Sequence, residues 1–331
     1  MIVLLPETIF SFHFLLYRYE MLLTMVDGKI CNAITSTTSS QRCYICGATP
    51  SDMNNVDRMK DRATNKEAFQ FGLSTLHAWI RFMEYFIHLA YRLDFEKWQA
   101  KGLNSQKLIE RKKYIQKQFR VEMGLLIDMP RSGGCGTSND GNTARRFFRE
   151  WKKSAEILKL KPILLYRCKC ILEALASGFK IDTVKFEQYC LQTARNLVET
   201  YPWFYLPVTV HKILFHGSTI IASFLVPIGQ LSEEAQESKN KDIRRFRLDH
   251  TRKISRKATN TDLFHRLLES SDPMITSLRS LPKQNKKLPM SNDAKALLVA
   301  VAQDDSDDDS QCESDVENIS DLLQILYLAC T

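Results

Sequence analysis

Two groups of side chains in this chain have the types and spacings that hold metal ions. Cys43 and Cys46 form a Cys-x-x-Cys pair, and His211 and His216 form a His-x4-His pair much later in the chain. Two thiolates and two imidazoles are a common tetrahedral ligand set for structural zinc. Because the pairs lie so far apart, they would close a long insertion rather than form a zinc finger. The alternative is that the histidines are ordinary helix residues and the cysteines are a free or redox pair.

Carboxylates form the second group. Asp27 ends the short apolar run LLTMVD, which is followed by Gly28 and is typical of a buried strand with a turn after it. Glu237 lies in a late, charged stretch with a helical pattern. Metal-dependent phosphoryl transfer uses such acids to hold two Mg²⁺ or Mn²⁺ ions. By pattern alone, Glu237 fits a solvated helical acid equally well.

The elements that would position these residues are mainly helices. Glycine and proline are sparse, at 12 and 10 residues, which favours long helices over a turn-rich β fold. Apolar spacing and breaker residues predict helices over residues 69–98, 106–126, 142–160, 162–176, 183–200 and 232–260, and a short helix pair over 261–281. The expected fold class is therefore mostly α.

Charge points to a polyanionic partner. The formal net charge is +8, although residues 304–321 carry a dense acidic run, so the preceding part is more basic than the total. A basic body favours nucleic acid, whereas a solvated basic surface without a partner is the alternative. Two stretches concentrate the candidate nucleic-acid contacts: Arg145, Arg146, Arg149 and Lys152, and then Arg244, Arg245 and Arg247. In the first stretch, the aromatic residues Phe147, Phe148 and Trp151 lie between the cations, a pattern that can grip a nucleic-acid backbone. An amphipathic helix with a solvated basic face fits this pattern at least equally well.

The nine cysteines form no regular framework, which indicates reduced thiols in a reducing compartment. The apolar first 25 residues lack a basic start and are interrupted by Pro6, Glu7, Arg18 and Glu20, unlike a signal peptide. No apolar run reaches the roughly 18–20 residues of a membrane span. We therefore expect neither a membrane partner nor a secretory signal.

Several stretches, in order, resemble the Transib-type DDE transposases and the related catalytic subunit of the vertebrate recombination-activating recombinase. They include VDGKICNAITSTTSSQRCYICGATP, GNTARRFF, YPWFYLPVTVHKILFHG and IGQLSEEAQESKNKDIRRFR. The resemblance covers about residues 20–282. It implies an RNase H-like core with a large zinc-anchored helical insertion, and cutting and joining of DNA by a triad of acids with divalent metal.

Carried onto this sequence, the resemblance assigns Asp27 as the second acid and Glu237 as the third, with Glu234 as a nearby matching acid. Cys43, Cys46, His211 and His216 fall on the zinc ligands. The implied domains are residues 1–42 as a remnant of the core strands, 43–216 as the insertion, 217–282 as carboxy-terminal core helices, and 283–331 as a mostly disordered acidic tail. The implied partner is double-stranded DNA in the nucleus, bound by a homodimer, with no small-molecule substrate.

The first acid of the triad has no counterpart upstream of Asp27, where only Glu7 and Glu20 occur, in the wrong context. The resemblance thus predicts an amino-terminally shortened relative with an incomplete sheet and an incomplete triad. The leading hypothesis is a transposon-derived DNA-binding protein without catalysis. The alternatives are an active metal-dependent strand-transfer nuclease whose missing acid comes from elsewhere, and a zinc-stabilised helical scaffold or non-functional remnant.

Overall fold

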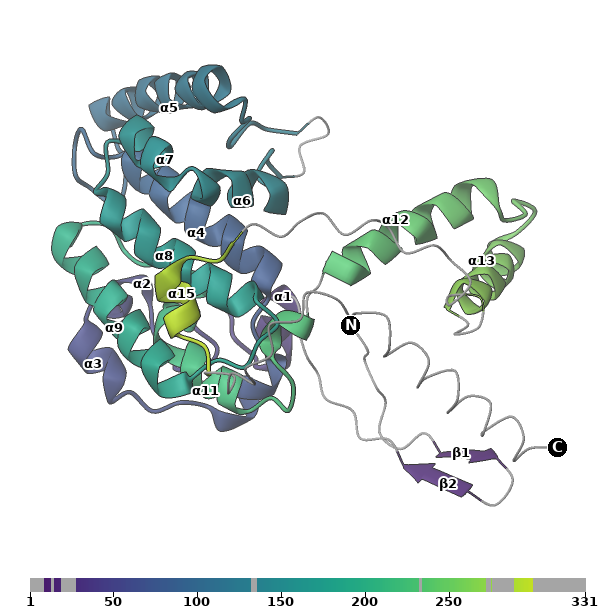
Figure 1. The fold of residues 1–331 in the computed structure, drawn as a ribbon. Coiled ribbons are helices and arrows are strands. Elements are labelled where there is room, and N and C mark those ends of the chain that lie inside the picture. Colours follow the sequence, from purple (N-terminus) through teal and green to yellow (C-terminus); the bar gives the residue numbers. More distant parts are fainter. Residues whose placement is uncertain are drawn as a thin grey trace, which may run out of the picture. The chain divides into compact units, whose positions relative to one another are not determined.

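Helices dominate the computed structural model, which describes residues 9–12, 15–18, 28–131, 136–231, 234–271, 275 and 289–299 (Figure 1). Residues 1–299 form one unit and residues 300–331 another, and the acidic run lies outside the described residues. The described strands are β1 (Ile9–Phe12) and β2 (Leu15–Arg18), which pair antiparallel with Ile9 opposite Arg18. The expectation of a mostly α fold is confirmed; the strand expected at residues 22–27 lies outside the described residues.

The helix α4 (Thr75–Ala90) is the central element of the helical body, by which we mean residues 28–231 together with 289–299. It contacts α6, α7, α8 and α10, and its inner face, including Phe82 and Phe86, is fully buried. It begins later than the predicted helix over 69–98, because Gly72 at φ 65° ends a preceding 3-10 helix and the Ser74 hydroxyl then accepts a hydrogen bond from the backbone N–H of His77.

Short elements precede α4 and surround the Cys-x-x-Cys loop. They are α1 (Gly28–Ile34), α2 (Pro50–Met53), α3 (Val56–Lys60) and the 3-10 helix η1 (Lys66–Phe71).

After α4, the chain forms α5 (Leu103–Met123), α6 (Gly141–Arg149) and α7 (Trp151–Leu158). The single helix expected over 142–160 is therefore divided at Glu150, whose ψ of 44° is not helical. The break lets Phe147 and Phe148 enter the core from α6 while the Ser154 hydroxyl of α7 donates to the Phe147 carbonyl at 2.8 Å.

The helices α8 (Pro162–Ala176) and α9 (Thr183–Thr200) have the bounds that the sequence predicts. Pro162 occupies the first turn of α8, where its missing N–H costs nothing. Gly178 adopts φ 77° after α8, and the Asp182 carboxylate then accepts hydrogen bonds from two backbone N–H groups at the start of α9.

A separate segment, residues 289–299, packs back on this helix pair and contains α15 (Asn292–Ala296). The Val299 N–H donates to the Lys180 carbonyl, and the Asp182 N–H donates to the Leu297 carbonyl. Ala294 and Leu297 are buried. This part of the expected tail therefore belongs to the helical body.

The remaining elements follow the aromatic stretch 201–207. They are α10 (Val208–His211), the π-helix η2 (Lys212–His216), α11 (Gly217–Ala222), the 3-10 helix η3 (Ile228–Leu231), α12 (Glu234–Asp249) and α13 (Arg256–Ser271). The helix expected over 232–260 is divided in two. The first part ends at Asp249, and the second begins after Ser255, whose hydroxyl accepts a hydrogen bond from the Ala258 N–H.

Candidate metal centre

The Cys-x-x-Cys loop is a tight turn whose backbone is fixed by hydrogen bonds. The Gly47 N–H donates to the Cys43 carbonyl at 2.7 Å, and the Cys43 N–H donates to the Ala48 carbonyl at 3.0 Å. Gly47 adopts φ 68°, a conformation that favours glycine. Arg62 also braces the turn, since its Nε donates to the Cys46 carbonyl at 2.7 Å. The loop therefore presents both sulfurs on one side.

The two histidines meet because the chain between them is not an ordinary α-helix. At about 100° per residue, side chains five apart on an α-helix diverge by roughly 140°. Residues 212–216 instead form a π-helix, whose hydrogen bonds join residues five apart. The rings of His211 and His216 consequently lie with their centroids 5.1 Å apart at 84°. The His-x4-His spacing predicted the pair, but not this turn.

Asn54 connects the cysteine loop to the segment that leads into the histidines. Its amide donates to the carbonyls of Pro202 and Phe204, at 3.3 and 3.2 Å, and its oxygen accepts from the Leu206 N–H at 2.9 Å. One side chain thus fixes residues about 150 positions away. Sequence reasoning missed Asn54, because its partners are backbone atoms that leave no pattern in the sequence.

The structure brings the four predicted ligands together in one buried group. One ligand atom from each of Cys43, Cys46, His211 and His216 lies within 4.8 Å of all the others. The Cys46 sulfur is 3.3 Å from Nε2 of His211, across 165 residues of sequence. All four residues are buried. Such a group matches one tetrahedral ion, whose ligand atoms lie about 2.0–2.3 Å from it.

Burial and mutual contact shift the protonation of these groups. A hydrogen bond from Cys46 lowers the pKa of Cys43 to about 7, and the same contact raises the pKa of Cys46. Burial lowers the pKa of His211, which keeps its imidazole neutral at neutral pH. Neutral imidazole and thiolate are the forms that bind metal. The pair Cys43 and His211 is therefore close to the ligand-competent state.

One buried nitrogen favours a metal over a redox pair. His211 turns its Nε2 toward Cys46, whereas Nε2 of His216 has no hydrogen-bond partner among the described residues. Leaving a buried polar atom unpaired costs about 1–3 kcal/mol. A disulfide or free thiol pair at Cys43 and Cys46 would leave that nitrogen unpaired, whereas a metal ion can use all four side chains. The group can therefore hold a metal ion such as zinc.

The predicted catalytic acids lie outside the part of the chain whose side chains the structure describes. Asp27 lies outside the described residues. The backbones of Glu234 and Glu237 lie in the first turn of α12, and their side chains are outside the described part. The assignment of Asp27 and Glu237 to a Mg²⁺ or Mn²⁺ site stays a prediction.

The predicted contact cations of α6 and α7 differ in how they are held. Arg146 is exposed but donates to the Met123 carbonyl at 2.8 Å and thereby caps the end of α5. Arg145 is half-buried, and this burial lowers its pKa. Arg149 and Lys152 are exposed and donate no hydrogen bond to another described residue. These last two are available to phosphates.

The aromatic residues between those cations pack in or against the hydrophobic core, as the amphipathic-helix alternative predicts. Phe147 and Phe148 are fully buried, and their rings lie 5.0 Å apart in an edge-on arrangement. Trp151 packs on Tyr166 at 5.1 Å. The alternation of basic and aromatic residues here therefore reflects an amphipathic helix with an apolar face toward the core.

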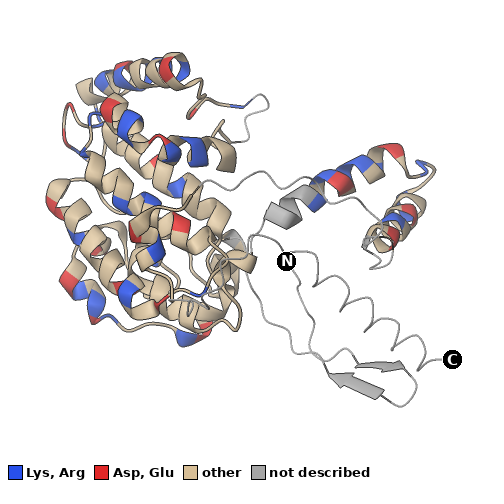
Figure 2. Cartoon of the chain, viewed as in Figure 1, with Lys and Arg blue, Asp and Glu red and all other residues tan. Residues whose placement is uncertain are grey.

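The second basic stretch lies on α12. Arg244, Arg245 and Arg247 are all exposed, and Arg245 pairs with Asp242 at 3.4 Å. Figure 2 shows Lys and Arg recurring along α5, α6 and α12, with acidic residues among them on α5 and α12. Exposed cations in this arrangement can neutralise phosphates without reading a sequence.

Compared with models of known protein families, the chain matches none, and no curated protein matches it. Among the described residues, no helix has both the length and the apolar character needed to cross a membrane.

Proposed function

We propose that this chain is a zinc-stabilised, DNA-binding protein related to the Transib-type DDE transposases. The observation that supports the proposal most is the meeting of Cys43, Cys46, His211 and His216 in one buried group. The family resemblance predicts the same four residues as zinc ligands. In that family, by the resemblance, a zinc ion joins the two ends of a helical insertion, and the same arrangement is proposed for this chain.

Zinc is the proposed ion because the donor set contains two sulfurs and two nitrogens. Mg²⁺ and Ca²⁺ prefer oxygen ligands, which this group lacks. Zinc without an open coordination position serves structure rather than catalysis. The ion would hold the loop around Cys43 against the turn around His211, and so keep the two ends of the helical body together.

DNA is the proposed partner because exposed cations occur on three elements. Arg149 and Lys152 lie on α6 and α7, and Arg244 and Arg247 lie on α12. Phosphate contacts of this kind release counterions from DNA. Each contact that is removed therefore reduces the slope of the logarithm of affinity against the logarithm of salt concentration. On this proposal binding is largely independent of sequence, and it takes place in the nucleus.

The test measures duplex binding by fluorescence anisotropy from about 50 to 200 mM salt. We expect affinity to fall steeply over this range, and the double variants Arg149→Gln/Lys152→Gln and Arg244→Gln/Arg247→Gln each to reduce the slope by about two. Lys185→Gln is the matched control, because Lys185 is an exposed cation whose partner is Asp182 on its own helix. Binding that does not respond to salt would contradict the proposal.

Catalysis is tested separately with duplex DNA and Mn²⁺. The expectation of an incomplete triad predicts the same background cleavage for the chain and for its Glu237→Gln variant. Cleavage that Glu237→Gln abolishes would contradict the expectation and favour the active strand-transfer nuclease.

A further inference from the structure

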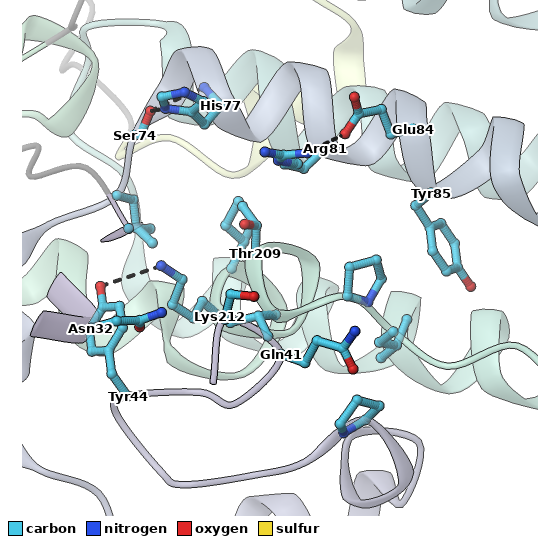
Figure 3. Close-up of a pocket in the computed structure, with 18 of the residues that line it drawn as sticks. Asn32, Gln41, Tyr44, Ser74, His77, Arg81, Glu84, Tyr85, Thr209 and Lys212 are labelled. Atoms are coloured by element: carbon cyan, nitrogen blue, oxygen red, sulfur yellow. Dashed lines mark hydrogen bonds and ion pairs between the residues drawn. The ribbon is translucent and has the colours of Figure 1, made fainter. Parts of the chain in front are cut away.

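A groove runs along α4 beside the metal centre. Its cavity has a volume of about 570 Å³, within the range of ligand sites in proteins. One wall is a single face of α4 with its cap, formed by Ser74, His77, Arg81, Glu84, Tyr85 and His88. The opposite wall includes Gln41, Tyr44, Thr209 and Lys212, which lie close in sequence to the metal ligands (Figure 3).

The groove is elongated. Ser74 and His88 both line it, and at 1.5 Å per residue they are separated by roughly 21 Å along the helix axis. A compact small molecule would fill a part of this length. An extended chain of several units fits the whole of it.

The two ends of the groove differ in chemistry. At the amino-terminal end of α4, Lys212 lies 4.5 Å over the ring of Tyr44 and donates to its hydroxyl at 3.4 Å (Figure 3). Further along, Arg81 pairs with Glu84 at 2.6 Å and keeps a side chain that is 53% exposed. The other end is aromatic, since Trp98 and Phe204 line it with their rings 4.9 Å apart.

Three polar side chains of the groove have unused hydrogen-bonding groups. The amides of Asn32 and Gln41 and the hydroxyl of Thr209 make no hydrogen bond to another residue in the part of the chain that the structure describes. An amide offers both a donor and an acceptor, which matches the polar edge of a nucleobase. These groups supply directional contacts between the cationic and aromatic parts.

We infer that this groove binds a short single-stranded segment of nucleic acid. Proteins that hold single strands combine cations that follow the backbone with aromatic rings on which bases stack. Lys212 and Arg81 supply the cations, and Trp98 supplies the aromatic surface. The inference rests on the proposed function, which makes nucleic acid the partner. It goes further because it assigns single strands to the groove, whereas the exposed cations of α6 and α12 would bind single-stranded and double-stranded nucleic acid alike.

The test uses a labelled thymidine oligonucleotide of about 12 nucleotides, a duplex of equal length, and free thymidine monophosphate as competitor. We expect Trp98→Ala to weaken single-strand binding about tenfold, and Lys212→Gln/Arg81→Gln to weaken it by a similar factor and reduce its salt dependence. Duplex affinity stays unchanged in both, and Lys185→Gln changes neither form. Gln41→Ala/Thr209→Ala, at exposed or half-buried positions, provides a variant with little effect on folding.

Metal content and thermal stability are measured for each variant, since Lys212 lies between the histidine ligands. Single-strand affinity that is unchanged in correctly folded groove variants overturns the inference, as does full competition by the free monophosphate at equal nucleotide concentration. Duplex binding with normal salt dependence then leaves the proposed function standing. A chain that binds neither form overturns both.

Discussion

The helical body and the α12–α13 pair are held together in different ways. In the body, contacts join residues far apart in sequence, such as Cys46 with His211 and Asn54 with Leu206. In the α12–α13 pair, the described ties are local: the Lys239 amine donates to the Ser270 hydroxyl at 2.7 Å, and Arg252 pairs with Asp262.

Burial separates the two regions further. Phe82, Phe86 and Phe148 of the body are fully buried. On α13, by contrast, Phe264 and Leu268 are 61% and 56% exposed. The body therefore carries its own hydrophobic core, whereas the pair presents charge and apolar surface. Long-range polar contacts therefore position the candidate metal ligands, whereas the basic helices are joined by short-range ones.

The largest expected effect follows from removing the metal centre. The double variant His211→Ala/His216→Ala deletes two ligands that join distant parts of the chain, so the closure of a long loop is lost together with metal binding. We expect loss of bound zinc and a decrease in the free energy of unfolding of roughly 5 kcal/mol or more. Elemental analysis and thermal denaturation measure both.

The matched control for this variant is His265→Ala, because His265 is exposed on α13 and lies outside the metal group. It should keep the metal and the melting temperature. Zinc retained in the double variant would show that the four-residue group is not the zinc site. An equal loss of stability in the double variant and in His265→Ala would show that the helical body does not depend on the metal group more than on α13.

A smaller effect is expected at Asn54. Asn54→Ala removes three hydrogen bonds and leaves the backbone groups of Pro202, Phe204 and Leu206 without their partner. The expected cost is about 1–3 kcal/mol in the free energy of unfolding, measured by urea denaturation. Asn55→Ala is the local comparison, since Asn55 caps only α3. An equal cost for the two would contradict a long-range role for Asn54.

The four candidate metal ligands could be anticipated mainly from the family resemblance, because their spacings alone also fit ordinary helix histidines and a free or redox cysteine pair. The bounds of α8 and α9 could be anticipated because Pro162 and Asp182 mark helix starts directly. The π-helix at 212–216 could not, since His-x4-His also fits an ordinary helix. On α6, the alternation of basic and aromatic residues fits both a nucleic-acid contact and an amphipathic helix, because alternation alone does not say which face is buried; burial of Phe147 favours the amphipathic helix.

Within the α12–α13 pair, the expected effects are smaller and local. The Asp262 carboxylate accepts three hydrogen bonds from Arg252. One comes from the backbone N–H at 2.8 Å, and two come from the guanidinium nitrogens Nε and Nη2 at 3.0 and 2.8 Å. Asp262→Asn weakens this contact at the turn between the helices. We expect faster amide hydrogen exchange in residues 249–262 and no change in metal content. Faster exchange throughout the helical body would contradict the local assignment.

The smallest effect is a dependence on acid at the same contact. Hydrogen bonds from Arg252 lower the pKa of Asp262 from 3.8 to about 2. Because the folded-state pKa is the lower one, the contact contributes fully above pH ~4, and its contribution is lost as pH falls from about 4 to about 2. The Arg252 side chain is 64% exposed, so solvent screens the pair and the gain is small. Titration of the carboxyl carbon by NMR should give a midpoint near the lower value in the intact chain and near 3.8 in Arg252→Gln. A midpoint that does not move in Arg252→Gln would show that the contact between the turn and α13 is not made in solution.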